Sequence, residues 1–399
     1  MSDVPHHTNP LGSQRKELPK STAVPPVSHA TSGVSFAHEQ PQSSVGEFPG
    51  VITRQTNPLN VEFPFPTLKS FHTRNEQFYI RTHFGVPELN AADWSLTIEG
   101  HVEQPIKIDY EELRKMPSQT LTALLECSGN SRALLEPPQV SIRWEQGGVS
   151  NAEWTGVPLS TVLERARVRQ GAVEVILEGH DKGTFEAPNP KTPGEIHYAR
   201  SLPIEKAKRP EVLLAYQMNG EDLPPEHGHP VRAIVAGWYG MASVKWLRRI
   251  VVTNQPFHGM FQTFMYSIWE RRNGLPTLAP VTEIAVKSQI ARPMLREVVQ
   301  AGSNYRIFGA AWSGAQEIKQ VEVSTDDGMT WSVAKLDEKS VPFAWRFFEH
   351  QWEVPCQPGR YRLISRATNS RGHRQPTERD DDRRNAMVSH VQPIEVFVQ

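Results

Sequence analysis

The chain has 399 residues, which is enough for two or three domains that each bury a hydrophobic core. Its 43 Lys and Arg residues almost balance its 44 Asp and Glu residues, and the net charge of -1 gives no overall attraction for nucleic acid or an anionic membrane. No apolar run reaches the about 18 residues of a membrane-spanning helix, and the N-terminus lacks the apolar segment of a signal peptide. The two cysteines, Cys127 and Cys356, suggest neither a disulfide framework nor a paired-cysteine zinc site, so we expect a soluble, cytoplasmic protein.

The first part of the chain divides by composition at about residue 45. Residues 1–45 are rich in Pro, Ser, His, Thr and Gln, which predicts a disordered or extended tail. Within residues 46–280, strand patterns occur in "DWSLTIEGHV" and "AVEVILEGHDKG", and apolar residues recur at helical spacing in "VPLSTVLERARV". A short helix is predicted for "IDYEELRKMP", with Asp109 as N-cap and Glu112 completing a capping box. This mixture predicts one α+β domain.

Residues 281–399 have a different pattern. Short runs with alternating apolar and polar residues, separated by Gly, Asp and Pro turns, include "YRIFGAAW", "IKQVEVSTDDGMTWSVAKL", "RYRLISRATNSRG" and "IEVFVQ". No helical pattern intervenes. This spacing is typical of an all-β sandwich.

Cys127 lies in "LTALLECSGNSR", after an apolar run that predicts a buried strand and before a Ser-Gly-Asn turn. A thiol at this place can face a cleft as a nucleophile or a metal ligand, or it can be a small buried apolar residue. The chain contains no G-x-S-x-G, H-E-x-x-H, Walker A or dinucleotide glycine motif. The residues around Cys127 therefore leave its role open.

A second stretch, "LAYQMNGEDLPPEHGHPVR" followed by "VKWL", together with "CSGNSR", resembles the sulfite oxidase family of molybdenum enzymes. In that family the longer motif binds a pyranopterin cofactor, and the cysteine of C-x-G-N-x-R is the metal's only protein thiolate. The resemblance covers about residues 50–399. It implies a molybdopterin-binding domain, an immunoglobulin-like β-sandwich dimerisation domain and a homodimer.

The resemblance further implies Mo-molybdopterin as the cofactor and Cys127 as the metal ligand. A soft thiolate suits a molybdenum ion that changes oxidation state. Cationic side chains would hold the pterin's phosphate. The positions that correspond to the family's cofactor contacts are Tyr79, Ile80, Arg81, Thr82, His83, Asp181, His227, Arg232, Ser243, Val244 and Lys245.

An oxyanion substrate needs arginines, whose planar donors replace its hydration. The family's catalytic positions correspond to Arg81, Arg132, Trp144, Tyr266 and Arg384. Three departures stand out: Thr82 replaces the common asparagine of F-x-x-R-N-H, and the neighbours of Arg384 and Tyr266 differ from the family's. Without the resemblance, each arginine would be a solvated surface charge. Tyr266 would then be a core residue, since "FQTFMYSIW" is apolar at helical spacing.

By this resemblance the chain is expected to oxidise sulfite to sulfate. It contains no C-x-x-C-H haem motif, and we expect no haem and no flavin portion, so a separate acceptor such as a cytochrome would take the electrons. Two alternatives stay open. The same cofactor and fold can serve nitrate, sulfane sulfur or a sulfoxide, or the chain can be a scaffold without catalysis.

Overall fold

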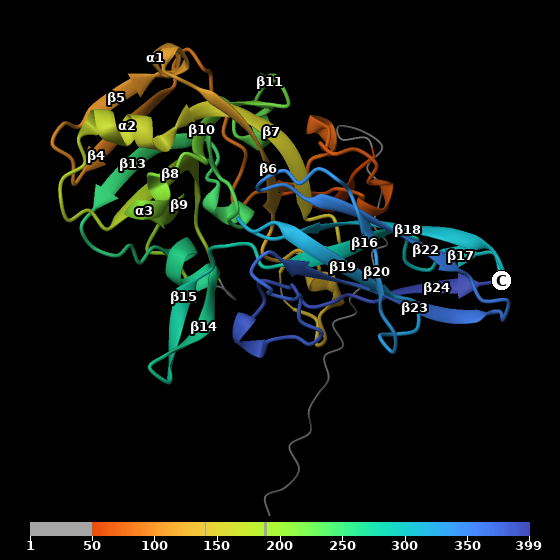
Figure 1. Ribbon diagram of the computed structural model, residues 1–399. Helices are drawn as coiled ribbons and strands as arrows, with labels where there is room; N and C mark the ends of the chain where they lie inside the picture. Colours follow the sequence, from red (N-terminus) through yellow and green to blue (C-terminus); the bar gives the residue numbers. More distant parts are fainter. Residues whose placement is uncertain (1–49, 140, 187–189) are drawn as a thin grey trace, which may run out of the picture. The chain divides into compact units, whose positions relative to one another are not determined.

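The computed structural model describes residues 50–139, 141–186 and 190–399. The predicted tail at residues 1–45 lies outside the described residues. Within them the chain folds into six β-sheets with short helices between the strands (Figure 1). The α+β class is confirmed, and the boundary predicted at residue 280 falls between the last strand of a hairpin, which ends at Pro280, and a strand that begins at Lys287.

Three sheets in the first part of the chain frame the site. One has the order β1-β2-β3. The second has the order β11-β10-β7-β6, with β12 beside β10, and the third has the order β5-β4-β13-β8-β9. Their strands are β1 (Ile52–Gln55), β2 (Asn60–Glu62), β3 (Ile80–Arg81), β4 (Ser95–Gly100), β5 (Ile106–Asp109), β6 (Gln119–Glu126), β7 (Val149–Pro158), β8 (Glu174–Gly183), β9 (Ile196–Pro203), β10 (Val212–Met218), β11 (Glu221–Asp222), β12 (Arg232–Val235) and β13 (Leu247–Thr253).

The helices are short, as the sequence predicted for two of them. Helix α1 (Tyr110–Lys115) begins after Asp109, whose carboxylate accepts from the backbone N–H of Glu112 at 2.7 Å. The capping box is only half formed, because the Glu112 carboxylate pairs with Arg165. The other elements are α2 (Leu159–Ala166), α3 (Ile204–Ala207), the 3₁₀ turns η1 (Phe65–Thr67), η2 (Asn75–Gln77), η3 (Arg132–Leu134), η4 (Pro225–His227), η5 (Gly240–Ala242) and η7 (Asp381–Arg383), and the π-helix η6 (Met260–Met265).

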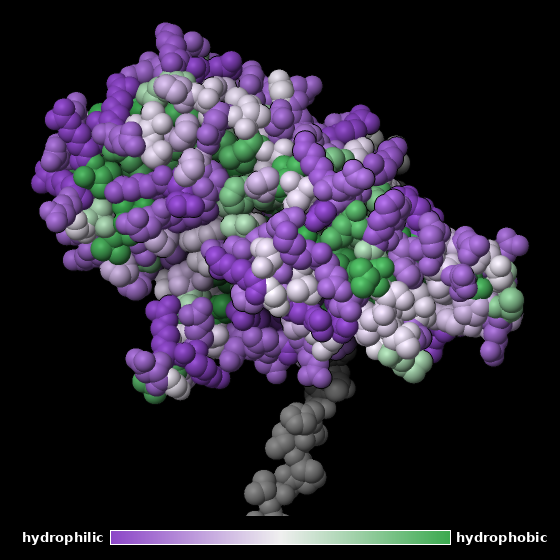
Figure 2. Space-filling model, in the orientation of Figure 1, coloured by the Kyte–Doolittle hydropathy of each residue, from purple (hydrophilic) through white to green (hydrophobic). Residues whose placement is uncertain are grey.

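A two-stranded hairpin, β14 (Ser267–Arg272) and β15 (Leu275–Pro280), follows the π-helix and stands apart from the larger sheets (Figure 1). Figure 2 shows a largely hydrophilic face with small separate apolar patches, one of them at the tip of this hairpin. Among the described residues, no helix has the length and apolar character that crossing a membrane requires.

The rest of the chain forms the predicted sandwich, which we define by its two sheets of order β16-β18-β22-β21 and β17-β24-β23-β19-β20. Buried side chains from both sheets pack into one core, as the alternating pattern predicted. The strands are β16 (Lys287–Arg292), β17 (Val298–Val299), β18 (Asn304–Trp312), β19 (Ile318–Ser324), β20 (Ser332–Val333), β21 (Lys335–Leu336), β22 (Arg346–Glu353), β23 (Gly359–Asn369) and β24 (Ile394–Val398).

Candidate active site

A cavity of about 640 Å³, part of it open to solvent, lies where β3, β6, β8 and the loops around β12 meet. It contains most of the side chains that the sequence marked as functional. Those that line it are Tyr79, Arg81, Thr82, His83, Cys127, Asp181, His227, Arg232, Ser243, Lys245 and Tyr266.

Cys127 follows the last residue of β6, as predicted. Its backbone N–H donates to Gly148 O at 2.8 Å, and its own carbonyl accepts from the N–H of Asn130 at the same distance. The side chain is 8% exposed and lines the cavity, so the thiol is accessible from inside it. The hydrogen bonds fix the backbone on both sides of the sulfur.

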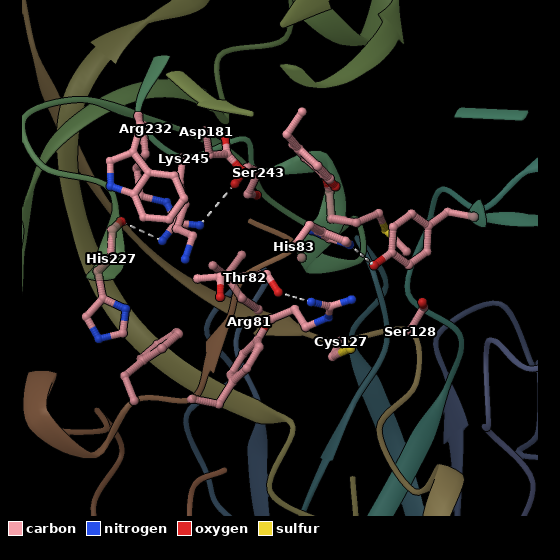
Figure 3. Close-up of a pocket in the computed structure, with 18 residues that line it drawn as sticks. Arg81, Thr82, His83, Cys127, Ser128, Asp181, His227, Arg232, Ser243 and Lys245 are labelled. Carbon is pink, nitrogen blue, oxygen red and sulfur yellow. Dashed lines mark hydrogen bonds between the residues drawn. The ribbon is translucent and has the colours of Figure 1, made fainter. Parts of the chain in front are cut away.

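Cationic side chains gather at the other end of the cavity (Figure 3). The buried Arg232 guanidinium donates to His227 O at 2.9 Å and to Ser243 O at 3.1 Å, and Lys245 Nζ donates to Glu226 O at 2.7 Å. These acceptors are neutral carbonyls, so they satisfy the donors without cancelling their charge. Burial, and then the neighbouring Arg232, lower the pKa of Lys245 well below its usual value.

Asp181 is the only carboxyl group among the described residues that line this cavity. It is buried, and its Oδ1 has no hydrogen-bond partner among the described residues. Burial raises its pKa to about 7, against the opposite effect of Lys245. Ser128 Oγ, next to Cys127, is buried and equally without a partner. Two unpaired polar atoms that face one cavity are expected where a ligand completes their hydrogen bonds.

Tyr266 and His83 meet beside Cys127. The Tyr266 hydroxyl lies 2.5 Å from His83 Nε2. Burial, followed by the charges of Arg81 and Lys245, lowers the pKa of His83 well below its usual value, which favours the neutral imidazole. Burial raises the pKa of Tyr266, although Arg81 has the opposite effect. The pair shares a proton in its hydrogen bond and lines the same cavity as the thiol.

Five predicted residues do not line the cavity. Trp144 is fully buried and packs edge-on against Tyr79 at 6.1 Å, and its Nε1 has no partner. Ile80 belongs to a small apolar cluster with Val51 and Val61. The others are Arg132, Val244 and Arg384.

The two predicted arginines that do not line the cavity, Arg132 and Arg384, donate hydrogen bonds to other residues of the protein. Arg132 is buried and donates to Asn385 O at 2.8 Å, Ser141 Oγ at 3.0 Å and Ile142 O at 3.1 Å. Arg384 is exposed and donates to Ser267 Oγ at 2.8 Å, which anchors the residue that follows Tyr266. Of the three predicted anion-binding arginines, the structure places only Arg81 in the cavity lining.

Sequence reasoning missed several residues of the site. Tyr198 lines the cavity, and its ring stacks on His83 at 4.7 Å. Arg200, two residues further along β9, is fully buried and donates to Phe261 O and Val281 O, on either side of Tyr266 in the chain. The alternation of β9 placed both on its inward face, but nothing local singled them out. Met241 and Trp246 also line the cavity, and their position within the recognised motif was the available signal.

The residues of the cavity fit a molybdenum-pterin cofactor. The described cavity lining contains three cationic side chains, Arg81, Arg232 and Lys245, and one carboxyl group. This leaves an excess of positive charge that can bind an anionic group such as a phosphate. The thiol and the basic end lie apart in the cavity (Figure 3), as an elongated ligand with a metal at one end requires. No group of three or more His, Cys, Asp or Glu residues among the described residues is placed to hold a metal ion, so a metal here would depend on the cofactor's own donors besides Cys127.

Two family models match the chain. Residues 83–261 match the oxidoreductase molybdopterin binding domain, and residues 279–389 match the Mo-co oxidoreductase dimerisation domain. Sulfite oxidase of Gallus gallus is 33% identical over 82% of this chain and 73% of its own length. Mitochondrial sulfite oxidase of Rattus norvegicus is 32% identical, and the alignment spans 62% of its length.

Relatives that are named for other activities match as well. Nitrate reductase [NADH] 1 of Arabidopsis thaliana is 33% identical over 75% of this chain and 35% of its own length. The solved structure of the sulfane dehydrogenase SoxCD from Paracoccus pantotrophus has a TM-score of 0.73 and 27% identity, and covers 94% of this chain and 93% of that chain. With the two domain models in the expected order and the cavity between the thiol and the basic end, the chain belongs to the sulfite oxidase family of molybdopterin oxidoreductases.

Proposed function

We propose that this enzyme oxidises sulfite to sulfate and passes the electrons to a separate acceptor, such as a cytochrome. The observation that carries the proposal is the position of Arg81 and of the Tyr266–His83 pair in the same cavity as the Cys127 thiol. The sulfite oxidases among the relatives support the choice of substrate.

The reaction adds one oxygen atom from water to sulfite and releases two electrons and two protons. Molybdenum, held by its cofactor and Cys127, supplies the oxygen-transfer and redox chemistry when bound. Arg81 would bind the substrate's charge, and its guanidinium is held near the thiol by bonds to Thr82 O and Asn60 Oδ1. The neutral His83 imidazole would accept a proton through the Tyr266 hydroxyl.

A second substrate class is favoured by one observation. Arg132 and Arg384 donate to protein acceptors and do not line the cavity, so Arg81 alone of the three predicted arginines lines it. An organic or protein-bound sulfane sulfur presents less charge at the reacting atom. The likeness to a sulfane dehydrogenase over 94% of this chain supports this alternative.

Steady-state turnover with an artificial acceptor separates these substrates. The enzyme is assayed with sulfite, with a sulfane-sulfur compound, and with nitrate and a reduced donor. We expect the highest kcat/KM with sulfite. A higher kcat/KM with the sulfane compound would replace the proposed substrate, and turnover of nitrate alone would reject both.

Metal content tests the role of Cys127. Cys127→Ser should lose most of its molybdenum, while pterin is retained by the distant cations. Molybdenum is measured by elemental analysis and pterin by the fluorescence of its oxidised form. Full molybdenum content in the variant would reject Cys127 as the ligand.

The remaining parts of the proposal concern the protein's setting. We propose a homodimer formed through the sandwich, supported by the match to a dimerisation domain, with the domain boundary near residue 280. We also propose a cytoplasmic location and an electron acceptor on a separate chain. Light scattering tests the homodimer, and cell fractionation tests the cytoplasmic location.

A further inference from the structure

The loop that carries the cysteine, residues 127–132, is hydrogen-bonded to the C-terminal part of the chain; we call it the cysteine loop. Met387 N–H donates to Ser128 O at 2.7 Å, and Arg132 donates to Asn385 O at 2.8 Å. Both acceptor–donor pairs join residues more than 250 positions apart in the chain. The loop's geometry therefore depends on a distant part of the sequence.

Lys287, in β16 of the sandwich, makes the most deeply buried of these contacts. Its side chain is 1% exposed, and Nζ donates to Glu126 Oε1 at 3.1 Å, Ser131 Oγ at 3.1 Å and Asn130 O at 3.3 Å. All three donors of the ammonium group are used. Two of the acceptors belong to the cysteine loop, and the third is the residue immediately before Cys127.

The acceptors are themselves held in place. Glu126 Oε1 also accepts from Asn130 Nδ2 at 3.1 Å, and its Oε2 accepts from Trp312 Nε1 at 2.9 Å. Gln289 Nε2, from the same strand as Lys287, donates to Ser131 Oγ at 2.9 Å. The sandwich thus supplies three donor side chains to a network that surrounds the loop.

We propose that Lys287 is a positioning residue for the metal-binding thiol: by holding Asn130 and Ser131, the sandwich fixes the cysteine loop in the conformation that presents Cys127 to the cofactor. The inference rests on the proposed function, because it takes Cys127 as the metal ligand. It gives the sandwich a part in cofactor binding in addition to dimerisation.

The ion pair between Lys287 and Glu126 does not by itself require the further bonds from Lys287 to Asn130 O and Ser131 Oγ. Replacing both members of such a pair with neutral residues is often harmless to stability, whereas removing one member leaves a charge that burial penalises. Lys287→Met should therefore destabilise the fold through the unpaired Glu126. In Glu126→Gln/Lys287→Met the charge penalty is absent, but the bonds to Asn130 O and Ser131 Oγ are still missing.

The two variants separate positioning from stability. Hydrogen–deuterium exchange is followed on peptides that cover the cysteine loop, in full-length protein made with and without the cofactor. We expect exchange in the loop to rise about ten-fold or more in both variants, because the Lys287 bonds to Asn130 O and Ser131 Oγ are lost in both. Thermal stability should fall in Lys287→Met and recover in the double variant.

Lys206→Met is the matched control. Lys206 is a partly buried lysine, 15% exposed against 1% for Lys287, and is paired with Glu211 at 2.9 Å and bonded to Ala236 O at 3.1 Å, away from the cysteine loop. Its removal should lower stability without changing exchange in the loop. Loop exchange that returns to the parent rate in the double variant, or rises equally in the control, would overturn the proposal.

The molybdenum content per pterin completes the test. Both Lys287 variants should hold less molybdenum per pterin than the parent, with the pterin content little changed. Full molybdenum occupancy together with fast loop exchange would overturn the link to the metal. Absence of molybdenum from every protein, the parent included, would instead reject the proposed function, and the exchange data would still decide whether Lys287 holds the loop.

Discussion

The cations of the cavity are buried without carboxylate partners, and this determines what the site can bind. Arg232 and Lys245 donate to backbone carbonyls, which satisfy their hydrogen bonds and leave their charge in place. The cost of burying these charges appears as the lowered pKa values of both groups, to about 10 for Arg232. An anion bound between them would relieve that cost. The two side chains therefore favour the binding of an anionic cofactor.

The Tyr266 hydroxyl is expected to matter for turnover rather than for cofactor binding. Its partner is His83 Nε2 at 2.5 Å, and removing it breaks the path by which a proton would reach the imidazole. Tyr266→Phe should lower kcat by about 10- to 100-fold with normal pterin and molybdenum content. Tyr305→Phe, which removes a hydroxyl bonded to Glu297 in the sandwich, is the control. An unchanged kcat in Tyr266→Phe would exclude this proton path.

His227 gives the cofactor-free protein a specific pH dependence. Burial, followed by Lys245 and Arg232, lowers its pKa to about 3, whereas an unfolded chain has a histidine pKa of about 6.5. Between these values the unfolded chain binds more protons, so stability is fully present above about pH 6.5 and is lost as the pH falls toward 3. The loss from this residue is at most about 5 kcal/mol.

Urea unfolding of the cofactor-free chain between pH 7 and 4 measures this effect. His227→Gln retains a donor for Asn75 O, the partner of His227 Nε2 at 3.1 Å, but does not titrate. The stability difference between the two proteins should therefore shrink as the pH falls. A difference that is constant over this range would show that His227 does not contribute.

At the scale of secondary-structure elements, local sequence patterns predicted those helices and strands that are determined by residues close together in the chain. The spacing of Leu159, Val162 and Leu163 gave α2, and the apolar run before Cys127 gave β6, because one buried face repeats with the period of each element. The family motif located the cavity residues. The two-residue strand β3 is too short to show such a period, and the helical spacing of "FQTFMYSIW" did not indicate that η6 is a π-helix.

The hydrogen-bond partners of the Arg132 guanidinium could not be predicted from the sequence, for a related reason. Its acceptors include Asn385 O, which lies 253 positions away, and periodicity carries no information on such contacts. The same holds for Lys287 and Glu126, which are 161 positions apart. Resemblance placed Arg132 at the anion site, but only the fold shows how its guanidinium is oriented.

The turn of the cysteine loop depends on a glycine. A Cβ atom at Gly129 would lie 2.3 Å from Cζ of Arg132, whose guanidinium is fixed by three bonds. Gly129→Ala should therefore displace the arginine and reduce the free energy of unfolding by about 1–3 kcal/mol. At Gly359 the nearest contact would be at 3.7 Å, so Gly359→Ala is the control, and urea unfolding compares the two. Equal stability of the Gly129 variant and the parent would mean that the guanidinium has room to move.

On the scale of the whole molecule, the hydrophobic core of the cofactor-binding part extends into the sandwich, which also has a core of its own. Trp312 and Trp345, from the sandwich and the segment before β22, belong to the same buried cluster as Phe65 and Leu124. Trp345 Nε1 donates to Phe71 O at 2.9 Å, and Leu124 N–H donates to Phe343 O at 2.9 Å. An interface this apolar opposes independent movement of the two parts.

Thermal unfolding of the cofactor-free chain should consequently be one cooperative transition. Calorimetry would give a single endotherm whose calorimetric and van't Hoff enthalpies agree. Trp345→Ala removes a fully buried side chain and should destabilise the protein by about 3–5 kcal/mol. Because the buried cluster that contains Trp345 spans both parts, the whole transition should move to lower temperature without splitting. Two transitions, of which only one responds to Trp345→Ala, would show that the sandwich unfolds by itself and that its contacts with the cysteine loop are not coupled to the rest of the fold.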